Sequence, residues 1–123
     1  MEGLPSKASS YGKLMASFSP GDIVIVKFPF RENPTMFSER PAMVISKEGE
    51  EEYKLSQITR TDRRGELKGE WIDKKSKEFK PMGIREPSFI NLENILVVHP
   101  ALIKYGPIGK YPNVEELLKL YNI

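Results

Sequence analysis

The chain has 123 residues, of which 39% are hydrophobic and 29% are charged, and its formal net charge is +2. This length suits one domain with a single core, and so small a net charge does not by itself indicate a nucleic-acid partner. The lack of cysteine and the single histidine exclude disulfides, thiolate metal sites and a histidine-rich metal cluster, so we expect no metal or cofactor. No apolar run is long enough for a transmembrane helix, and the first residues lack the apolar core of a signal peptide, so we expect a cytoplasmic protein.

Residues 1–18 mix glycine, serine, lysine and proline without a clear period, which predicts a flexible or loosely docked arm ahead of one domain over residues 19–123. The domain opens with a nearly unbroken run of β-branched residues, Ile23–Phe28. Such a run predicts a strand that is covered on both faces, as in a small closed barrel. Pro29 ends this strand because proline has no N–H to donate to a sheet.

A long connection from Pro29 to Glu39 leads to a second strand, predicted over Ala42–Ser46. The connection exceeds a hairpin turn, and loops of this length usually cover something. It carries the ionisable side chains of Arg31 and Glu32. Arg40 stands where this loop meets the strand, and its position makes it the leading candidate for a functional residue.

Later segments continue the β pattern. Tyr53–Ile58 alternates and predicts a third strand that ends at Thr59, and Glu70–Ile72 predicts a short strand. Phe89–Leu92 and Ile95–Val98 predict two short strands or one bent strand.

The chain closes with a predicted helix. Asn113 is a favourable N-cap residue and Glu116 follows three positions later, as in a capping box. Apolar side chains recur at helical spacing and should cover one end of the barrel. These residues are Val114, Leu117, Leu118 and Tyr121.

Two basic segments could contact phosphates. Arg60, Arg63 and Arg64 fall within five residues after Thr59, and the polar turn at residues 73–80 carries Lys74 and Lys75. Either segment alone reads as a solvated loop, but side by side they would form a basic groove, because arginine forks match phosphate oxygens.

Two further side chains are expected to be structural. Trp71 lies between the basic segments, and core packing is favoured there over stacking on a nucleobase. His99 is the one side chain that ordinarily titrates near neutrality, but Pro100 follows it at a strand end, so it too is interpreted as structural.

These features resemble the PemK-like branch of the MazF/PemK toxins. The resemblance runs from Gly21 to about Leu120 and is most specific in two blocks, Gly-Asp-Ile-Val-Ile-Val-Lys-Phe-Pro-Phe at 21–30 and Arg-Pro-Ala-Met-Val-Ile-Ser at 40–46. Weaker matches are Leu55–Thr59, Pro87-Ser88 and Ile108–Lys110. The resemblance implies a mainly β, SH3-like barrel with a C-terminal helix, a homodimer, and an antitoxin that covers the loop at 29–39. It also implies cleavage of single-stranded mRNA without a metal.

In this resemblance Arg40 matches the family's catalytic arginine, which holds the phosphate, and Thr59 matches its catalytic threonine. Attack by the ribose 2′-hydroxyl builds negative charge on the phosphate, and neutralising that charge is commonly the largest catalytic contribution. Some family members use an Arg-x-Asp pair in the late strand, which Ile90-Asn91-Leu92 lacks. The substitute candidates for proton transfer are Glu32, Glu39 and Asp62. The residues predicted to contact RNA are Arg31, Arg60, Arg63, Arg64, Lys74, Lys75 and Ser88.

Two other functions stay open on the sequence. A toxin of the same fold could poison DNA gyrase by binding it, in which case Tyr121–Ile123 would matter and Arg40 would not. A small barrel could also bind RNA or a protein without cutting. Replacing Arg40 by alanine separates these possibilities, because only cleavage depends on stabilising the transition state.

Overall fold

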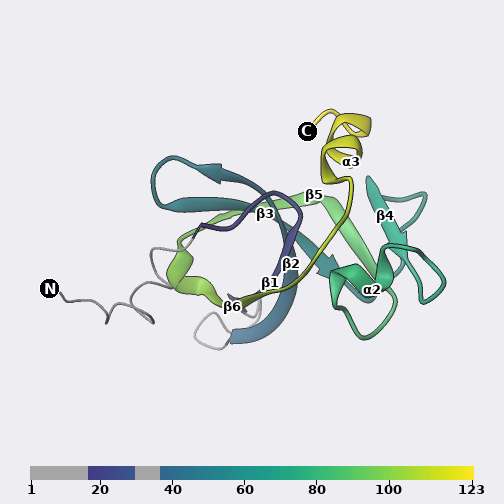
Figure 1. Cartoon of the computed structure of the whole chain (residues 1–123), viewed down its shortest axis with the longest axis horizontal. Coiled ribbons are helices and arrows are strands. Elements are labelled where there is room, and N and C mark those ends of the chain that lie inside the picture. The colour runs from purple at the N-terminus through teal and green to yellow at the C-terminus, as the bar shows by residue number, and fades with distance from the viewer. Residues whose placement is uncertain (1–16, 30–36) are drawn as a thin grey trace, which may run out of the picture.

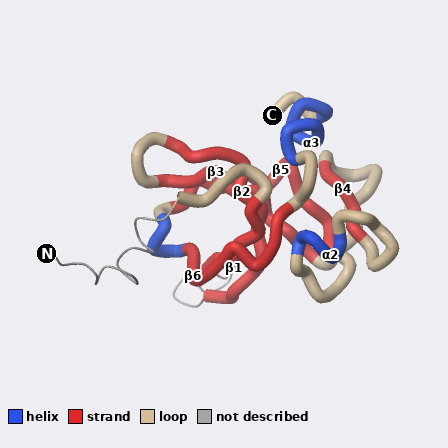
Figure 2. Tube along the Cα trace, viewed as in Figure 1, coloured by secondary structure: helices blue, strands red, loops and turns tan. Residues whose placement is uncertain are grey.

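The computed structural model of the protein describes residues 17–29 and 37–123. Six strands, two short α-helices and one 3-10 turn make up the described part (Figures 1 and 2). The strands are β1 (Asp22–Pro29), β2 (Phe37–Glu48), β3 (Glu52–Thr59), β4 (Gly69–Ile72), β5 (Ser88–Val98) and β6 (Ile103–Lys110). The helical elements are α2 (Phe79–Met82), the 3-10 turn η1 (Pro100–Leu102) and α3 (Val114–Leu120).

The six strands form one antiparallel sheet in the order β4-β5-β3-β2-β1-β6. This confirms the prediction of a mainly β fold with a C-terminal helix. The sheet is open, with β4 and β6 as its edges, and closure into a barrel is not seen within the described residues.

The open sheet is nevertheless strongly curled. Val98 at the end of β5 and Ile103 at the start of β6 are joined by the short turn η1, although β3, β2 and β1 lie between their strands. In a flat sheet four strand spacings would separate them by roughly 19 Å. Five residues reach at most about 18 Å. The sheet must therefore bend to bring the two strands together, as Figure 1 shows.

Both faces of the sheet are covered by apolar side chains, as predicted for β1. Ile23 belongs to a cluster that includes residues of α2 and α3, whereas Val24 and Val26 belong to a second cluster. Alternation along the strand explains this division, because successive side chains point to opposite faces. Phe18 adds to the second cluster by packing edge-on against Tyr53, with ring centroids 5.4 Å apart.

Helix α3 is anchored as its apolar stripe predicts. Val114 and Leu117 are buried, and Leu118 and Tyr121 pack beside them. Each fully buried large apolar side chain contributes ~1.5–3 kcal/mol, so the stripe is enough to hold so short a helix against the sheet. The Tyr121 hydroxyl also lies 2.9 Å from both the Gly69 carbonyl oxygen and a Glu70 carboxylate oxygen, which ties α3 to β4.

The predicted capping box at Asn113 is wrong. Asn113 has a left-handed backbone with φ of 60°, and its side chain makes no capping hydrogen bond. A side-chain cap needs an extended backbone at that position. The helix begins instead with the N–H groups of Glu116 and Leu117 donating to the Asn113 carbonyl, at 3.1 and 3.2 Å.

One strand differs from its predicted limits, one selects between two predicted alternatives, and one was not predicted. β2 begins at Phe37, so Arg40 lies within the strand opposite Val26 and not at its entry. β5 is one strand with a register shift, which selects the bent alternative over two short strands. β6 was not predicted, because Gly106 and Pro107 are typical of a loop, but an edge strand tolerates proline.

Candidate active-site groove

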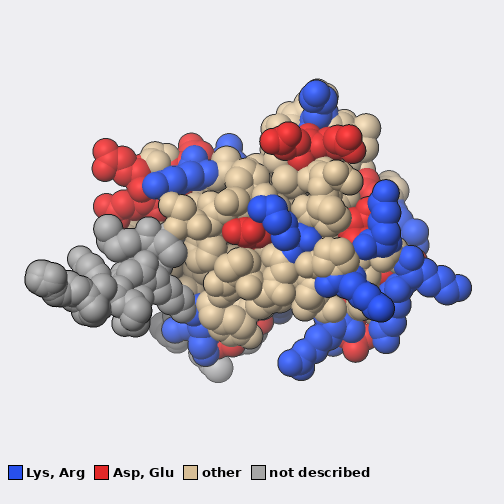
Figure 3. All heavy atoms as spheres, in the orientation of Figure 1, with Lys and Arg blue, Asp and Glu red and all other residues tan. Residues whose placement is uncertain are grey.

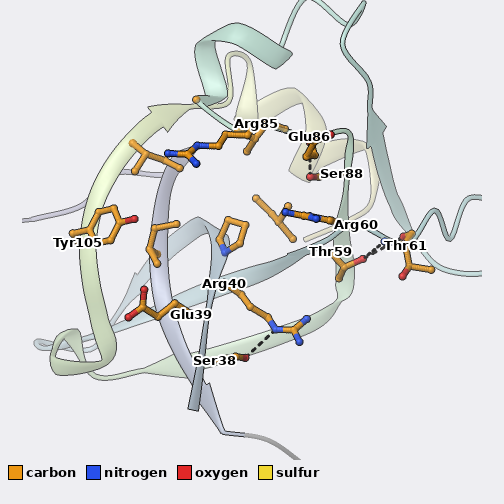
Figure 4. Close-up of a pocket in the computed structure, with 16 residues that line it drawn as sticks. Ser38, Glu39, Arg40, Thr59, Arg60, Thr61, Arg85, Glu86, Ser88 and Tyr105 are labelled. Carbon is orange, nitrogen blue, oxygen red and sulfur yellow. Dashed lines mark hydrogen bonds between the residues drawn. The ribbon is translucent and has the colours of Figure 1, made fainter.

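A groove of about 850 Å³ opens between β2, the end of β3, the segment at residues 83–88, and β6 (Figure 4). Its apolar lining is Ile25, Pro41, Ile58, Ile84 and Ile108, together with Gly83. Its polar lining is Ser38, Glu39, Arg40, Thr59, Arg60, Thr61, Arg85, Glu86, Ser88 and Tyr105. An apolar floor with polar groups around it is the usual form of a ligand site.

The groove brings Arg40 and Thr59 together. Ala42 of β2 is opposite Gln57 of β3, and Arg40 and Thr59 each lie two residues beyond that pair. The pairing itself ends at Ala42 and Gln57, and its register extended by two residues puts Arg40 and Thr59 on the same face of the sheet, where both line the groove. Figure 4 shows both on the same side of the opening, with Arg85 and Glu86 on the other. The two residues that the resemblance names as catalytic are thus neighbours in space.

Arg40 is exposed, and its guanidinium group is accessible to a ligand. Its Nε donates a hydrogen bond to Ser38 Oγ at 3.1 Å, which orients the guanidinium. No ion pair to Arg40 is found among residues 17–29 and 37–123. The remaining N–H groups can therefore bind an anion in the bidentate manner of arginine.

The Thr59 hydroxyl is held locally. It accepts a hydrogen bond from the Thr61 N–H at 3.1 Å and donates to the Thr61 carbonyl at 3.2 Å. This arrangement closes the end of β3. Contact with a phosphate oxygen requires the hydroxyl to turn its hydrogen from the Thr61 carbonyl to the ligand.

The three arginines of the groove make no ion pair with any residue that the structure describes. Like Arg40, neither Arg60 nor Arg85 makes an ion pair within the described part of the chain. The arginines just outside the groove are paired: Arg63 with Glu66 at 2.9 Å and Arg64 with Asp62 at 2.7 Å. Among these five arginines, the ones without an ion pair in the described part of the chain are therefore the three that line the groove.

The predicted proton-transfer residues are placed very differently. Glu39 lines the groove but forms an ion pair with Lys104. Asp62 lies outside the lining, and its hydrogen bond to Arg64 lowers the pKa of the Asp62 carboxyl, which weakens it as a base. Glu32 falls outside the described residues, as does Arg31.

The sequence did not single out Arg85, Glu86 or Tyr105, which all line the groove. Pro87-Ser88, one of the weak matches to the toxins, directly follows the first two and was the signal nearest to them. Ser88 is nearly buried, and its hydroxyl donates to the Glu86 carbonyl at 2.8 Å. Ser88 thereby fixes the turn that presents Arg85 and Glu86.

The other predicted RNA contacts lie apart from the groove. Arg63 and Arg64 follow β3, and Lys74 and Lys75 follow β4; all four are exposed and none lines the groove. Figure 3 shows Lys and Arg side chains projecting from the end of the molecule that holds β4 and α2. The prediction that these residues contact RNA thus concerns a second surface beside the groove.

No protein-family model matches this sequence, and no curated protein is significantly similar to it. The likeness to the toxins thus rests on the residues quoted above. Within the described ranges, no helix is long and apolar enough to cross a membrane. The same ranges contain no group of three or more His, Cys, Asp or Glu side chains placed to hold a metal ion.

Proposed function

We propose that the protein is a toxin-type endoribonuclease that cuts single-stranded mRNA in the cytoplasm without a metal. The observation that carries the proposal is the placement of Arg40 and Thr59 in one groove, where Arg60 and Arg85 also make no ion pair within residues 17–29 and 37–123. Three guanidinium groups that no described acidic side chain neutralises suit a polyanion better than a neutral ligand. The homodimer and the inhibiting antitoxin belong to the proposal through the resemblance.

The proposed reaction is an internal transfer at one phosphate. The ribose 2′-hydroxyl attacks the adjacent phosphorus, its proton passes to a base, and the 5′-oxygen leaves with a proton. The products are a 2′,3′-cyclic phosphate and a 5′-hydroxyl. Arg40 holds the phosphate and offsets the charge that grows on its oxygens, and the Thr59 hydroxyl donates to one of them. Arg60 and Arg85 hold neighbouring phosphates.

Glu86 is the candidate for the base. It lines the groove, and its carboxylate has no ion-pair partner among the residues described. Glu39, the other carboxylate of the lining, is engaged by Lys104. A general base needs an accessible carboxylate within reach of the substrate, and of these two Glu86 has the carboxylate without an ion-pair partner.

The test is a cleavage assay on a long single-stranded RNA in excess EDTA, with freshly refolded protein and the product ends mapped. We expect cuts at short defined sites that leave cyclic phosphate ends. Arg40→Ala should lower the rate about 10²–10³-fold, the usual cost of a lost transition-state contact, and Thr59→Val should also lower it. Arg63→Ala, which removes an arginine outside the groove, is the control and should cut normally. Equal cleavage by Arg40→Ala and the natural protein would refute the proposal.

A second candidate is an RNA-binding protein that does not cut. The observation that favours it is the Thr59 hydroxyl, whose hydrogen bonds are both made to Thr61. Tight RNA binding with no cleavage by the natural protein would select this function. The gyrase-binding alternative would use Tyr121, but that side chain is tied to Gly69 and Glu70.

A further inference from the structure

Trp71 is not packed in the core, so the core position favoured for it from the sequence is wrong. It is partly exposed on the edge strand β4, and it belongs to neither hydrophobic cluster. Its neighbour Ile72 is buried in the cluster beside α3. A large aromatic side chain that stays accessible on an edge strand is available to a ligand.

The sheet places Trp71 in line with the groove. Thr59 of β3 is opposite Phe89 of β5, and Phe89 is opposite Trp71 of β4. Opposite residues of antiparallel strands share a face, so this row continues the pair of Arg40 and Thr59 across the sheet. Two strand spacings separate Thr59 from Trp71, or about 10 Å. A single strand bound at Arg40 can cover that distance within a few nucleotides.

The loop between β3 and β4 links the two places directly. It begins with Arg60 and Thr61 in the groove and continues to Arg64, whose guanidinium carbon lies 5.7 Å from the centroid of the Trp71 ring. Arg64 is held there because its Nε and Nη2 donate hydrogen bonds to Asp62 Oδ2, at 3.0 and 2.7 Å. The Arg64 side chain is 64% exposed, so it covers the indole only loosely.

Two lysines follow Trp71 in the sequence. Lys74 and Lys75 come after β4, separated from it by Asp73; both are exposed, and their ammonium groups make no ion pair within residues 17–29 and 37–123. An aromatic face flanked by cations that track a backbone is the common form of a single-strand site.

We propose that Trp71 is the stacking platform for one nucleobase of the single-stranded RNA, a few nucleotides from the phosphate held at Arg40. The base takes the place of Arg64 on the indole, and the released guanidinium pairs with a phosphate in place of Asp62. Stacking of a base on an aromatic ring is worth more than an exposed ion pair, so the exchange is favourable. This inference rests on the proposed function, because it supplies a subsite for the same RNA.

Trp71 is the only tryptophan of the chain, so its fluorescence reports on this site alone. The test titrates the natural protein with an unlabelled eight-nucleotide strand of 2′-O-methyl RNA, which lacks the attacking hydroxyl and cannot be cut. A fluorescein-labelled copy measures binding separately by anisotropy. We expect saturable quenching of the tryptophan emission at the same concentrations at which the anisotropy rises.

Two substitutions complete the test by anisotropy. Trp71→Leu should weaken binding about 10-fold, and Trp71→Phe, which keeps an aromatic face, should restore most of the loss. Binding with unchanged tryptophan emission and unchanged affinity in Trp71→Leu would overturn this inference and leave the groove as the RNA site. No binding in either measurement would overturn both this inference and the proposed function.

Discussion

Gly109 of β6 lies so close to α2 that a Cβ at position 109 would stand 2.2 Å from the carbonyl carbon of Met82. No side chain fits at that distance. A second close contact lies one residue earlier in β6, where a Cβ at position 83 would stand 2.2 Å from the carbonyl oxygen of Ile108. The two glycines let α2 rest on β6, and the chain that leaves α2 becomes the wall of the groove that carries Arg85 and Glu86.

Gly109→Ala should therefore destabilise the protein and disturb the groove together. Overpacking of this kind costs roughly 1–3 kcal/mol, so the free energy of unfolding in urea should fall by that amount. Gly65→Asn is the control, since a Cβ at position 65 meets nothing within 4 Å and asparagine tolerates the left-handed backbone found there. Equal stability of Gly109→Ala and the natural protein would show that α2 can move away without cost.

Arg60→Ala should reduce the salt dependence of RNA binding. Each phosphate neutralised on a single strand contributes about −0.7 to the slope of log K against log salt. Anisotropy titrations at several salt concentrations should show a shallower slope by about that amount. Arg63→Ala should change the slope less, because Glu66 already neutralises Arg63. An unchanged slope in Arg60→Ala would remove this residue from the RNA site.

Glu86→Gln should slow cleavage while leaving RNA binding intact. Loss of a general base typically lowers the rate about 10²–10⁴-fold. Glu39→Gln offers the matched comparison, because Glu39 lines the same groove but is engaged by Lys104. Single-turnover cleavage at saturating protein separates the chemical step from binding. If Glu39→Gln is the slower of the two variants, the base has been assigned to the wrong carboxylate.

Stability should fall in alkaline solution because of Tyr111. Burial raises the pKa of its hydroxyl to about 12. In the unfolded chain the pKa of this hydroxyl is near its ordinary value of about 10. Between pH 10 and 12 the unfolded state therefore binds fewer protons than the folded state, and raising the pH lowers the free energy of unfolding. The free energy of unfolding should decline from pH 10 to 12, and less steeply in Tyr111→Phe. Tyr105→Phe, at an exposed position, should decline like the natural protein.

Local pattern was enough to predict most of the fold. The uninterrupted apolar run of β1, the alternation of β3 and the helical spacing of the apolar residues in α3 are all visible in the sequence. Each pattern forms the predicted element in the structure. β6 was missed because Gly106 and Pro107 interrupt it, and only its pairing with β1 makes it a strand. The cap at Asn113 failed because its backbone dihedral angles are fixed by the turn that follows Tyr111, which composition does not reveal.

The site was predicted less completely than the fold. Thr59 and Arg60 were found because they stand at the end of a recognisable strand, and Arg40 because it precedes the apolar run of β2, although it lies within that strand. Arg85 and Glu86 reach the groove through the packing of α2 on β6, a contact between segments distant in sequence. The sequence also does not show which arginines form ion pairs. Arg60 and Arg63 look alike in the sequence, but in the part of the chain that the structure describes Arg63 pairs with Glu66 and Arg60 makes no ion pair.

The edge strand β6 also limits how copies of this protein can associate. Pro107 has no N–H to donate, and an antiparallel match of two β6 strands centred on Pro107 would set Lys104 of one copy against Lys110 of the other. Missing donors and opposed ammonium groups both discourage strands from adding at an edge. The fold therefore resists growth into fibres at this edge, and two copies are not expected to join by pairing their β6 strands.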